Sequence, residues 1–180
     1  MALIVLERDG VINEQGSSPV STPEEWRPLP GALEAIGRLT QSGHRVVVAM
    51  DEPALADGSL SVEALNSVNT RMLESVSAQT GIVEAVFFCS HKGNAEGDEQ
   101  AQKTDLLNQV CKRARTPASG VIAIGRNALD VACAEAIGAR AVLIAHDEQG
   151  TAQLSGSSVR TGDMFESLAA FADCYLGGEN

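Results

Sequence analysis

Aromatic residues are scarce in this sequence, and long apolar runs are missing from it. Aromatics make up 3% of the 180 residues, so a core must be built mainly from Val, Ile, Leu and Ala, which suits a parallel sheet covered by helices. No apolar run reaches the ~18 residues that a membrane helix needs. The apolar start of the chain also lacks the basic region of a signal peptide. We therefore expect a cytoplasmic protein without a membrane partner.

Positive charge is in short supply as well. The chain has 13 Lys and Arg against 24 Asp and Glu, for a net charge of −11. Nucleic acids and anionic membranes attract clusters of Lys and Arg, so we expect no nucleic-acid partner. A small metabolite or a protein partner stays open. The four cysteines contain no CxxC pair and are expected to be reduced thiols.

Short apolar runs alternate with helical patterns along the whole chain, whose length suits one domain over 1–180. The runs typical of buried strands are 2–6, 46–49, 83–89, 121–124 and 141–145. The expected helices are 31–43, 61–79, about 104–113, 129–137 and 164–176, with loops at 13–24 and 90–102. This alternation predicts an α/β fold, a doubly wound three-layer sandwich with a parallel sheet.

Polar residues follow four of the predicted strands at the point where each strand ends. In a doubly wound sheet, sites lie outside the carboxyl ends of the strands. We therefore expect a site at this edge. The segments that should form it are Glu7-Arg8-Asp9, Met50-Asp51-Glu52, Cys89-Ser90-His91 and Gly125-Arg126-Asn127.

The first of these segments continues into Gly10-Val11-Ile12-Asn13 and resembles the DxDGVIN opening of the haloacid-dehalogenase superfamily. Further segments are similar to one branch, the D-glycero-D-manno-heptose 1,7-bisphosphate phosphatases, which have histidinol-phosphate phosphatases as close relatives. These segments are 21–26, 28–33, 45–49, 87–91 and 165–171. The resemblance implies a haloacid-dehalogenase-like, Rossmannoid domain with little or no cap and a family role in carbohydrate metabolism.

The resemblance also implies roles for the strand-end residues. In the family an aspartate attacks phosphorus and a second aspartate acts as acid and base; here Glu7 stands at the nucleophile position and Asp9 at the acid/base position. The extra methylene of Glu7 displaces the attacking oxygen by roughly 1 Å, which can cost about 10²-fold. Met50 replaces the phosphate-binding hydroxyl and can donate no hydrogen bond. Asp51 and Glu52 are expected to add negative charge near the phosphate.

The family's magnesium site is altered too. Arg126 replaces the aspartate that would ligate Mg²⁺, whereas Asp130 is retained and can serve the helix dipole. The family's Arg-Lys pair falls on Gln100 and Ala101, although Lys103 matches a second family lysine and could hold phosphate. We predict that the Arg126 guanidinium takes the place of Mg²⁺ and pairs with Glu7 or Asp9, as its fixed fork of donors allows.

A zinc loop of the family survives here only as a remnant. Cys89 and His91 match its CxH, but Gly97 and Glu99 stand where its CxC belongs. Structural zinc takes four ligands, so zinc is not expected.

Two functions from different classes remain open on this pattern. One is a non-catalytic binding or regulatory protein that keeps the phosphatase fold and needs no cofactor. The other is a weak or altered Mg²⁺-dependent phosphomonoesterase that uses Glu7 and Asp9 on a sugar phosphate or histidinol phosphate. Arg126 discriminates between them, because an active enzyme has no evident use for it.

Overall fold

The computed structural model describes residues 1–90, 98–145 and 163–178. In these ranges six parallel strands form one sheet in the order β3-β2-β1-β4-β5-β6. The chain winds outward from the central β1 in both directions, so the doubly wound topology is confirmed. The strands are β1 (Leu3–Leu6), β2 (Arg45–Asp51), β3 (Val86–Cys89), β4 (Val121–Gly125), β5 (Arg140–Ile144) and β6 (Met164–Phe165).

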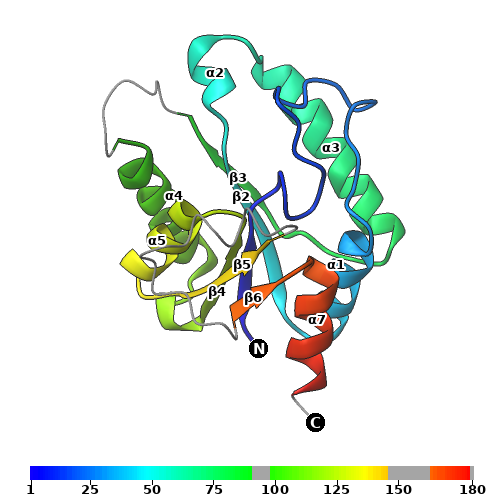
Figure 1. Ribbon diagram of the computed structural model, residues 1–180, viewed down its shortest axis with the longest axis vertical. Coiled ribbons are helices and arrows are strands. Elements are labelled where there is room, and N and C mark those ends of the chain that lie inside the picture. The colour runs from blue at the N-terminus through cyan, green and yellow to red at the C-terminus, as the bar shows by residue number, and fades with distance from the viewer. Residues whose placement is uncertain (91–97, 146–162, 179–180) are drawn as a thin grey trace.

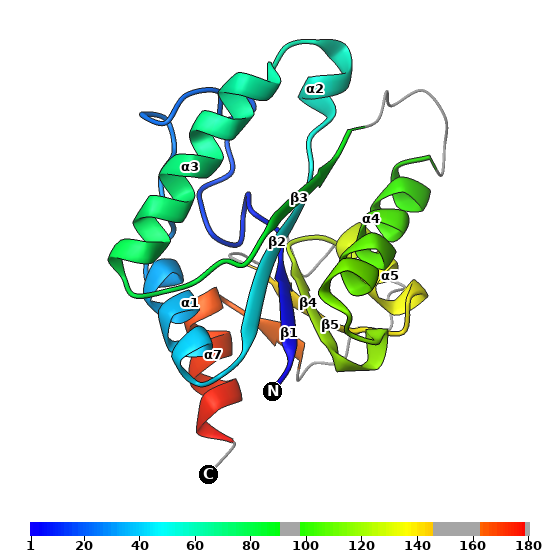
Figure 2. The same ribbon diagram turned by 180° about the vertical axis from the view of Figure 1, so that it is seen from behind.

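Helices cover both faces of the sheet and complete three layers (Figures 1 and 2). One face carries α1 (Ala32–Gln41), α3 (Val62–Ala78) and α7 (Leu168–Gly177), and the other carries α4 (Asp98–Ala114) and α5 (Ala128–Ala136). The short α2 (Pro53–Asp57) stands beyond the carboxyl end of β2 (Figure 1). None of the helices in the described ranges has the length and hydropathy that crossing a membrane requires.

The alternation of side chains along β1 divides the core in two. Successive side chains of a strand point to opposite faces. Ile4 and Leu6 accordingly belong to the apolar cluster under α1, α3 and α7, whereas Leu3 and Val5 belong to the cluster under α4. This alternation also sets the directions of the polar residues that follow.

The predicted loop at 90–102 is wrong in its last part, because α4 begins at Asp98. Residues 98–103 are Asp, Glu, Gln, Ala, Gln and Lys. Several of these are good helix formers, but the segment has no apolar periodicity by which a helix could be recognised. The early start of α4 decides where Lys103 lies.

Other boundaries differ from the predicted ones. Met164 and Phe165 form β6 and not the first turn of a helix, since α7 is capped at Ser167, whose side chain accepts a hydrogen bond from the backbone of Ala170. The strand expected from residue 83 begins at Val86. The helix α2 was not predicted, although Pro53 occupies its first turn, where proline is favoured.

Candidate functional site

The chain makes a tight turn immediately after β1, and this turn presents Glu7, Arg8 and Asp9 at the strand end. Glu7 extends the sheet, because its amide donates to the Ile124 carbonyl at 2.9 Å. The amide of Ile12 then donates to the Arg8 carbonyl at 2.9 Å, and Gly10 has φ +80°, a conformation that glycine adopts without strain. Glu7 continues the side of β1 that faces α4, and Arg8 continues the side that faces α3.

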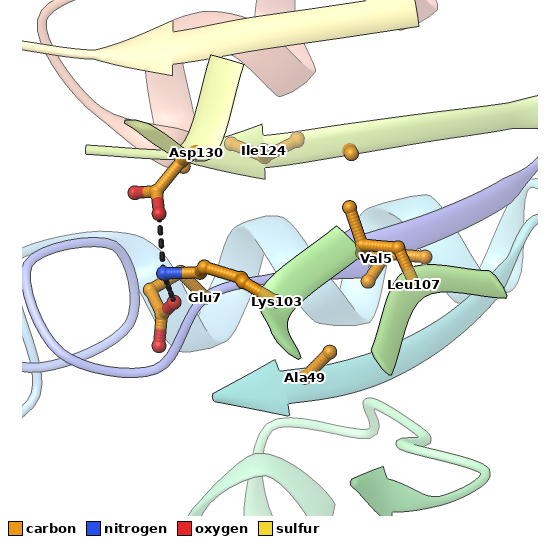
Figure 3. A pocket seen from close by; sticks show the side chains of 9 residues that line it. Val5, Glu7, Ala49, Lys103, Leu107, Ile124 and Asp130 are labelled. Atoms are coloured by element: carbon orange, nitrogen blue, oxygen red, sulfur yellow. Dashed lines mark ion pairs between the residues drawn. The ribbon is translucent and has the colours of Figure 1, made fainter. Parts of the chain in front are cut away.

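Lys103 of α4 lies between two buried carboxylates (Figure 3). Its Nζ is 2.9 Å from Oε2 of Glu7 and also forms an ion pair with Oδ1 of Asp130. All three residues are less than a tenth exposed. Beneath them lies a cavity of about 30 Å³ with mostly apolar walls, which is room for about one water and too small for a metabolite.

Burial and ion pairing act in opposite directions on these groups. Burial raises the pKa of Glu7 to about 7, although the charge of Lys103 opposes the rise. Burial alone would lower the pKa of Lys103, but its ion pairs with Glu7 and Asp130 raise it above the usual range. Lys103 therefore stays charged at neutral pH.

Asp130 also caps α5, in whose first turn it lies. Its Oδ2 accepts from the backbone N–H of Asn127 at 3.3 Å, in addition to that of Arg126 at 2.8 Å, and the Asn127 side chain accepts from the backbone N–H of Asp130 at 2.9 Å. This reciprocal arrangement is a capping box at the start of α5. Both oxygens of the carboxylate are thus engaged, one by the helix start and the other by Lys103.

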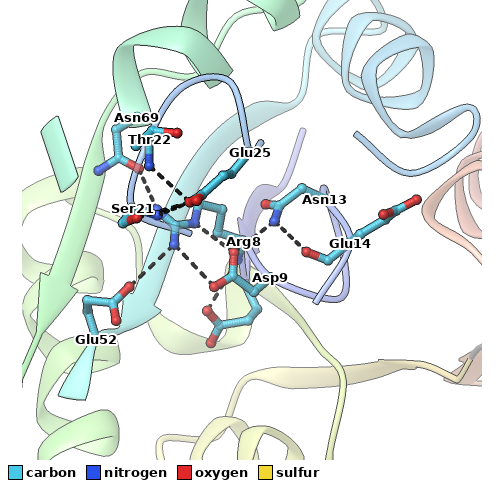
Figure 4. A network of polar contacts seen from close by, with 10 residues as sticks. Arg8, Asp9, Asn13, Glu14, Ser21, Thr22, Glu25, Glu52 and Asn69 are labelled. Atoms are coloured by element: carbon cyan, nitrogen blue, oxygen red, sulfur yellow. Dashed lines mark hydrogen bonds and ion pairs between the residues drawn. The ribbon is translucent and has the colours of Figure 1, made fainter. Parts of the chain in front are cut away.

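The Arg8 side chain is fully buried and forms a second polar cluster, toward α3 (Figure 4). Its Nε and Nη2 donate to the two carboxylate oxygens of Asp9, at 2.8 and 3.1 Å. Its Nη1 donates to Oδ1 of Asn69 at 3.1 Å, and Nη2 also donates to Oε2 of Glu52 at 3.3 Å. No pattern in the sequence pointed to Asn69, which comes from the distant helix α3.

Asp9 is held as an anion by this cluster. Burial alone would raise its pKa, but the hydrogen bonds from Arg8, together with one from Nδ2 of Asn13 at 2.9 Å, lower it below the usual range. Glu52, expected to repel phosphate, is instead buried and turned toward Arg8. Burial raises the pKa of Glu52 against the charge of Arg8.

The ion pair predicted for Arg126 is wrong. Within the described ranges Arg126 forms no ion pair, since Glu7 pairs with Lys103 and Asp9 with Arg8. These two cations reach the acids from α4 and from the adjacent position in the chain. Arg126 still lies close by, since its side chain packs against the turn at Gly10 and lines a cleft together with Asp9. Its charge lowers the pKa of both Glu7 and Asp9. Its Nε is buried and has no hydrogen-bond partner among the described residues.

The remaining predicted site residues are dispersed. Met50 is 2% exposed and belongs to the apolar core. The Cys89 thiol donates to Oδ1 of Asp51 at 3.7 Å, and burial together with that carboxylate raises its pKa to about 12. His91 and Gly97 of the zinc-loop remnant lie outside the described residues, and Glu99 is exposed on α4.

An open cleft of about 290 Å³ leads to this site from the solvent. Asp9 and Arg126 line it, together with Asp51 and Glu52. Residues 15–20 and the region of α2 line it as well. A ligand that reaches the strand ends through this cleft meets more carboxylates than cations.

The side chains present do not fit a divalent cation. Magnesium is bound through oxygen ligands, mainly carboxylates, but the carboxylates of Glu7 and Asp130 face Lys103, and that of Asp9 faces Arg8. Among the residues that the structure describes, no group of three His, Cys, Asp or Glu could hold a metal ion.

Comparisons with known proteins agree with this fold. No family model matches the chain. It is 31% identical over 176 residues to the D-glycero-β-D-manno-heptose-1,7-bisphosphate 7-phosphatase of Bordetella bronchiseptica, covering 98% of each chain. It is 32% identical to the protein of the same name from Pseudomonas aeruginosa, covering 97% of this chain and 98% of that one.

Solved structures give the same relationship. The D,D-heptose 1,7-bisphosphate phosphatase of B. bronchiseptica, in complex with magnesium and phosphate, superposes with a TM-score of 0.86 at 30% identity, covering 99% of each chain. The corresponding phosphatase of Burkholderia thailandensis gives a TM-score of 0.74 at 30% identity, over 98% of this chain and 99% of that one. The chain therefore belongs to the haloacid-dehalogenase-like family of D-glycero-D-manno-heptose-1,7-bisphosphate 7-phosphatases.

Proposed function

We propose that this chain is a non-hydrolytic member of its family, which uses the retained scaffold to bind a small metabolite or a protein partner. One observation carries the proposal. The carboxylates at the nucleophile and acid/base positions each face a side-chain cation, Lys103 and Arg8, while Arg126 stands where the family has a metal-ligating aspartate.

Phosphoryl transfer to a carboxylate needs positive charge to offset the repulsion between two anions and to stabilise the transition state. The charge of Lys103 is shared between Glu7 and Asp130. The apolar Met50 offers no hydroxyl to the phosphate. Asp9, whose pKa is lowered, is a poor proton donor to a leaving oxygen at neutral pH. Each of these features opposes hydrolysis.

The second candidate is a slow phosphomonoesterase acting on a sugar phosphate or histidinol phosphate. The names of the relatives favour it, since they are phosphatases. Lys103 favours it as well: the sequence assigned this lysine only a substitute role, yet its Nζ is 2.9 Å from the carboxylate at the nucleophile position.

An assay of phosphate release separates the two candidates. The substrates are heptose 1,7-bisphosphate, histidinol phosphate and p-nitrophenyl phosphate, each with and without Mg²⁺. We expect the wild type to release no more phosphate than the Glu7→Gln variant. The triple variant Glu7→Asp, Met50→Thr, Arg126→Asp restores the family's side chains at these three positions and is expected to gain Mg²⁺-dependent turnover. Turnover by the wild type above the Glu7→Gln level, with or without metal, would establish the phosphomonoesterase instead.

A further inference from the structure

Three cationic side chains lie around the carboxylates at the end of β1: Arg8 and Lys103 form ion pairs with them, and Arg126 packs against the turn at Gly10 and lines the same cleft as Asp9. We infer that these resident cations keep divalent metal ions out of the site, and that Arg126 is the residue that decides this. The inference deepens the proposed function and rests on it in part, but metal binding can be measured apart from turnover.

Local charge is nearly balanced without a metal ion. Four carboxylates form ion pairs with two of the cations. Asp9 and Glu52 pair with Arg8, and Glu7 and Asp130 pair with Lys103. Arg126 adds a third positive charge close to Glu7 and Asp9. With all of these groups ionised, four negative and three positive charges leave one negative charge, and none where Glu7, whose pKa burial raises to about 7, holds its proton. Asp51, which lines the cleft beside Asp9 and Arg126, adds one negative charge outside this cluster of ion pairs. A divalent ion would therefore enter a cluster with little net attraction for it.

The oxygens of these carboxylates are also already engaged in ion pairs and hydrogen bonds. Oε2 of Glu7 and Oδ1 of Asp130 face the Nζ of Lys103, and both oxygens of Asp9 accept from Arg8. A metal ion would have to compete with these buried ion pairs for its ligands. Such ions bind where ligand oxygens are arranged around an open position, and no such group exists among the described residues.

Arg126 differs from the other two cations because it forms no ion pair with any described residue. Its side chain lies against the turn after β1: a Cβ atom on Gly10 would be 2.6 Å from the Cδ of Arg126. The aliphatic part of the Arg126 side chain is therefore packed against the turn that carries both acids, and Arg126 lines the cleft together with Asp9. Replacing Arg126 by aspartate changes the local charge by two units and supplies an additional oxygen ligand, while Arg8 and Lys103 stay in place.

Binding of Mn²⁺, followed by electron paramagnetic resonance, tests the inference without substrate. We expect no saturable binding to the wild type at millimolar Mn²⁺. We expect at least about 100-fold tighter binding to Arg126→Asp, with Arg126→Gln in between because it removes the charge without adding a carboxylate. Arg71→Asp, the same charge change at an exposed position of α3, should bind no better than the wild type. Should Arg126→Asp fail to fold, Arg126→Asn adds a neutral oxygen ligand instead.

Two results would overturn the inference. One is saturable Mn²⁺ binding to the wild type that disappears in Glu7→Gln. The other is a folded Arg126→Asp protein that binds Mn²⁺ no better than the wild type. The proposed function fails separately: a wild type that binds Mn²⁺ without turnover refutes only this inference, and a metal-free wild type with turnover refutes only the proposed function.

Discussion

Arg8 and Asn69 stand 61 positions apart in the sequence, and the guanidinium Nη1 of Arg8 donates to the Asn69 side-chain oxygen at 3.1 Å. Both side chains are buried, so this hydrogen bond ties the carboxyl end of β1 to the middle of α3. The same guanidinium holds Asp9 through two hydrogen bonds. Asn69 thus supports the orientation of an acid that it does not touch.

Replacing Asn69 by alanine should destabilise the protein. The Arg8 donor would be left buried without its acceptor, which costs about 1–3 kcal/mol. Urea unfolding measures the change in the free energy of unfolding. Asn66→Ala is the matched control, because Asn66 is exposed on the same helix and its loss should cost less than about 0.5 kcal/mol. Equal effects of the two substitutions would show that the Arg8 bond contributes nothing.

The stability of the wild type relative to Glu7→Gln should fall as pH rises. Glu7 has a pKa of about 7 in the folded protein against an ordinary value of 4.5, chiefly because of burial. The folded state therefore holds a proton that the unfolded chain has lost between these values. The stabilisation that comes from this proton is fully present below pH 4.5 and is lost as pH rises through 7. The free energy of unfolding falls by up to roughly 3 kcal/mol over this range.

Urea unfolding of both proteins at pH 5 and pH 8 measures this difference. Other titrating groups are shared by the two proteins and largely cancel in the comparison. A difference in stability that stays constant between the two pH values would mean that Glu7 titrates normally.

Alanine at Gly10 should be more harmful than alanine at Gly58. Both glycines have φ +80°, so both substitutions carry the backbone strain of about 1–2 kcal/mol. Only at Gly10 does the new Cβ meet another side chain, the Cδ of Arg126 at 2.6 Å, whereas Gly58 has open space around it. Overpacking of this kind adds about 1–3 kcal/mol.

Thermal or urea unfolding of the two variants gives the comparison. In an Arg126→Ala background the excess cost of Gly10→Ala should disappear, since the obstructing side chain is gone. If the excess persists there, the close approach of Arg126 is not its cause.

Cys89 should resist alkylation at pH 8. The thiolate is the reactive species, and burial together with Asp51 raises the pKa of Cys89 to about 12. Cys174 is exposed on α7 and should be modified first. Mass spectrometry of peptides after a timed iodoacetamide reaction measures both rates. Modification of Cys89 as fast as Cys174 would contradict the burial and charge described for that thiol. The Asp51→Asn variant should speed the reaction at Cys89, because it removes the neighbouring negative charge.

The fold could be predicted largely from apolar runs. The runs around Ile4, Val47 and Ile122 are short, rich in branched residues and separated by helical patterns, which is the signature of a buried parallel sheet. The same reasoning located Glu7 and Asp9 at the strand ends, because the carboxyl ends of parallel strands share one edge. The predicted helix boundaries were less accurate where a capping residue, and not an apolar pattern, defines the helix start, as at Ser167.

The pairing of charges within the site could not be predicted in the same way. Arg126 was assigned to the acids because it follows a neighbouring strand, but Lys103 and Arg8 pair with those acids instead. Three cations compete for the same carboxylates, and side-chain reach decides the outcome. Lys103 reaches Glu7 only because α4 begins early, and Asn69 is brought to Arg8 by packing of a whole helix.

Glu7 and Arg8 are consecutive residues whose side chains reach opposite helical layers, Glu7 toward Lys103 on α4 and Arg8 toward Asn69 on α3. A one-residue slip of β1 would turn each of them to the opposite face of the sheet, because the side-chain period of a strand is two. If Arg8 moved into the place of Glu7, it would face Lys103, cation against cation in a buried place. Asp9 would then take the place of Arg8 beside Glu52, acid against acid. The alternation of charge at this point therefore disfavours a shifted register of the central strand, in addition to the apolar pattern that precedes it.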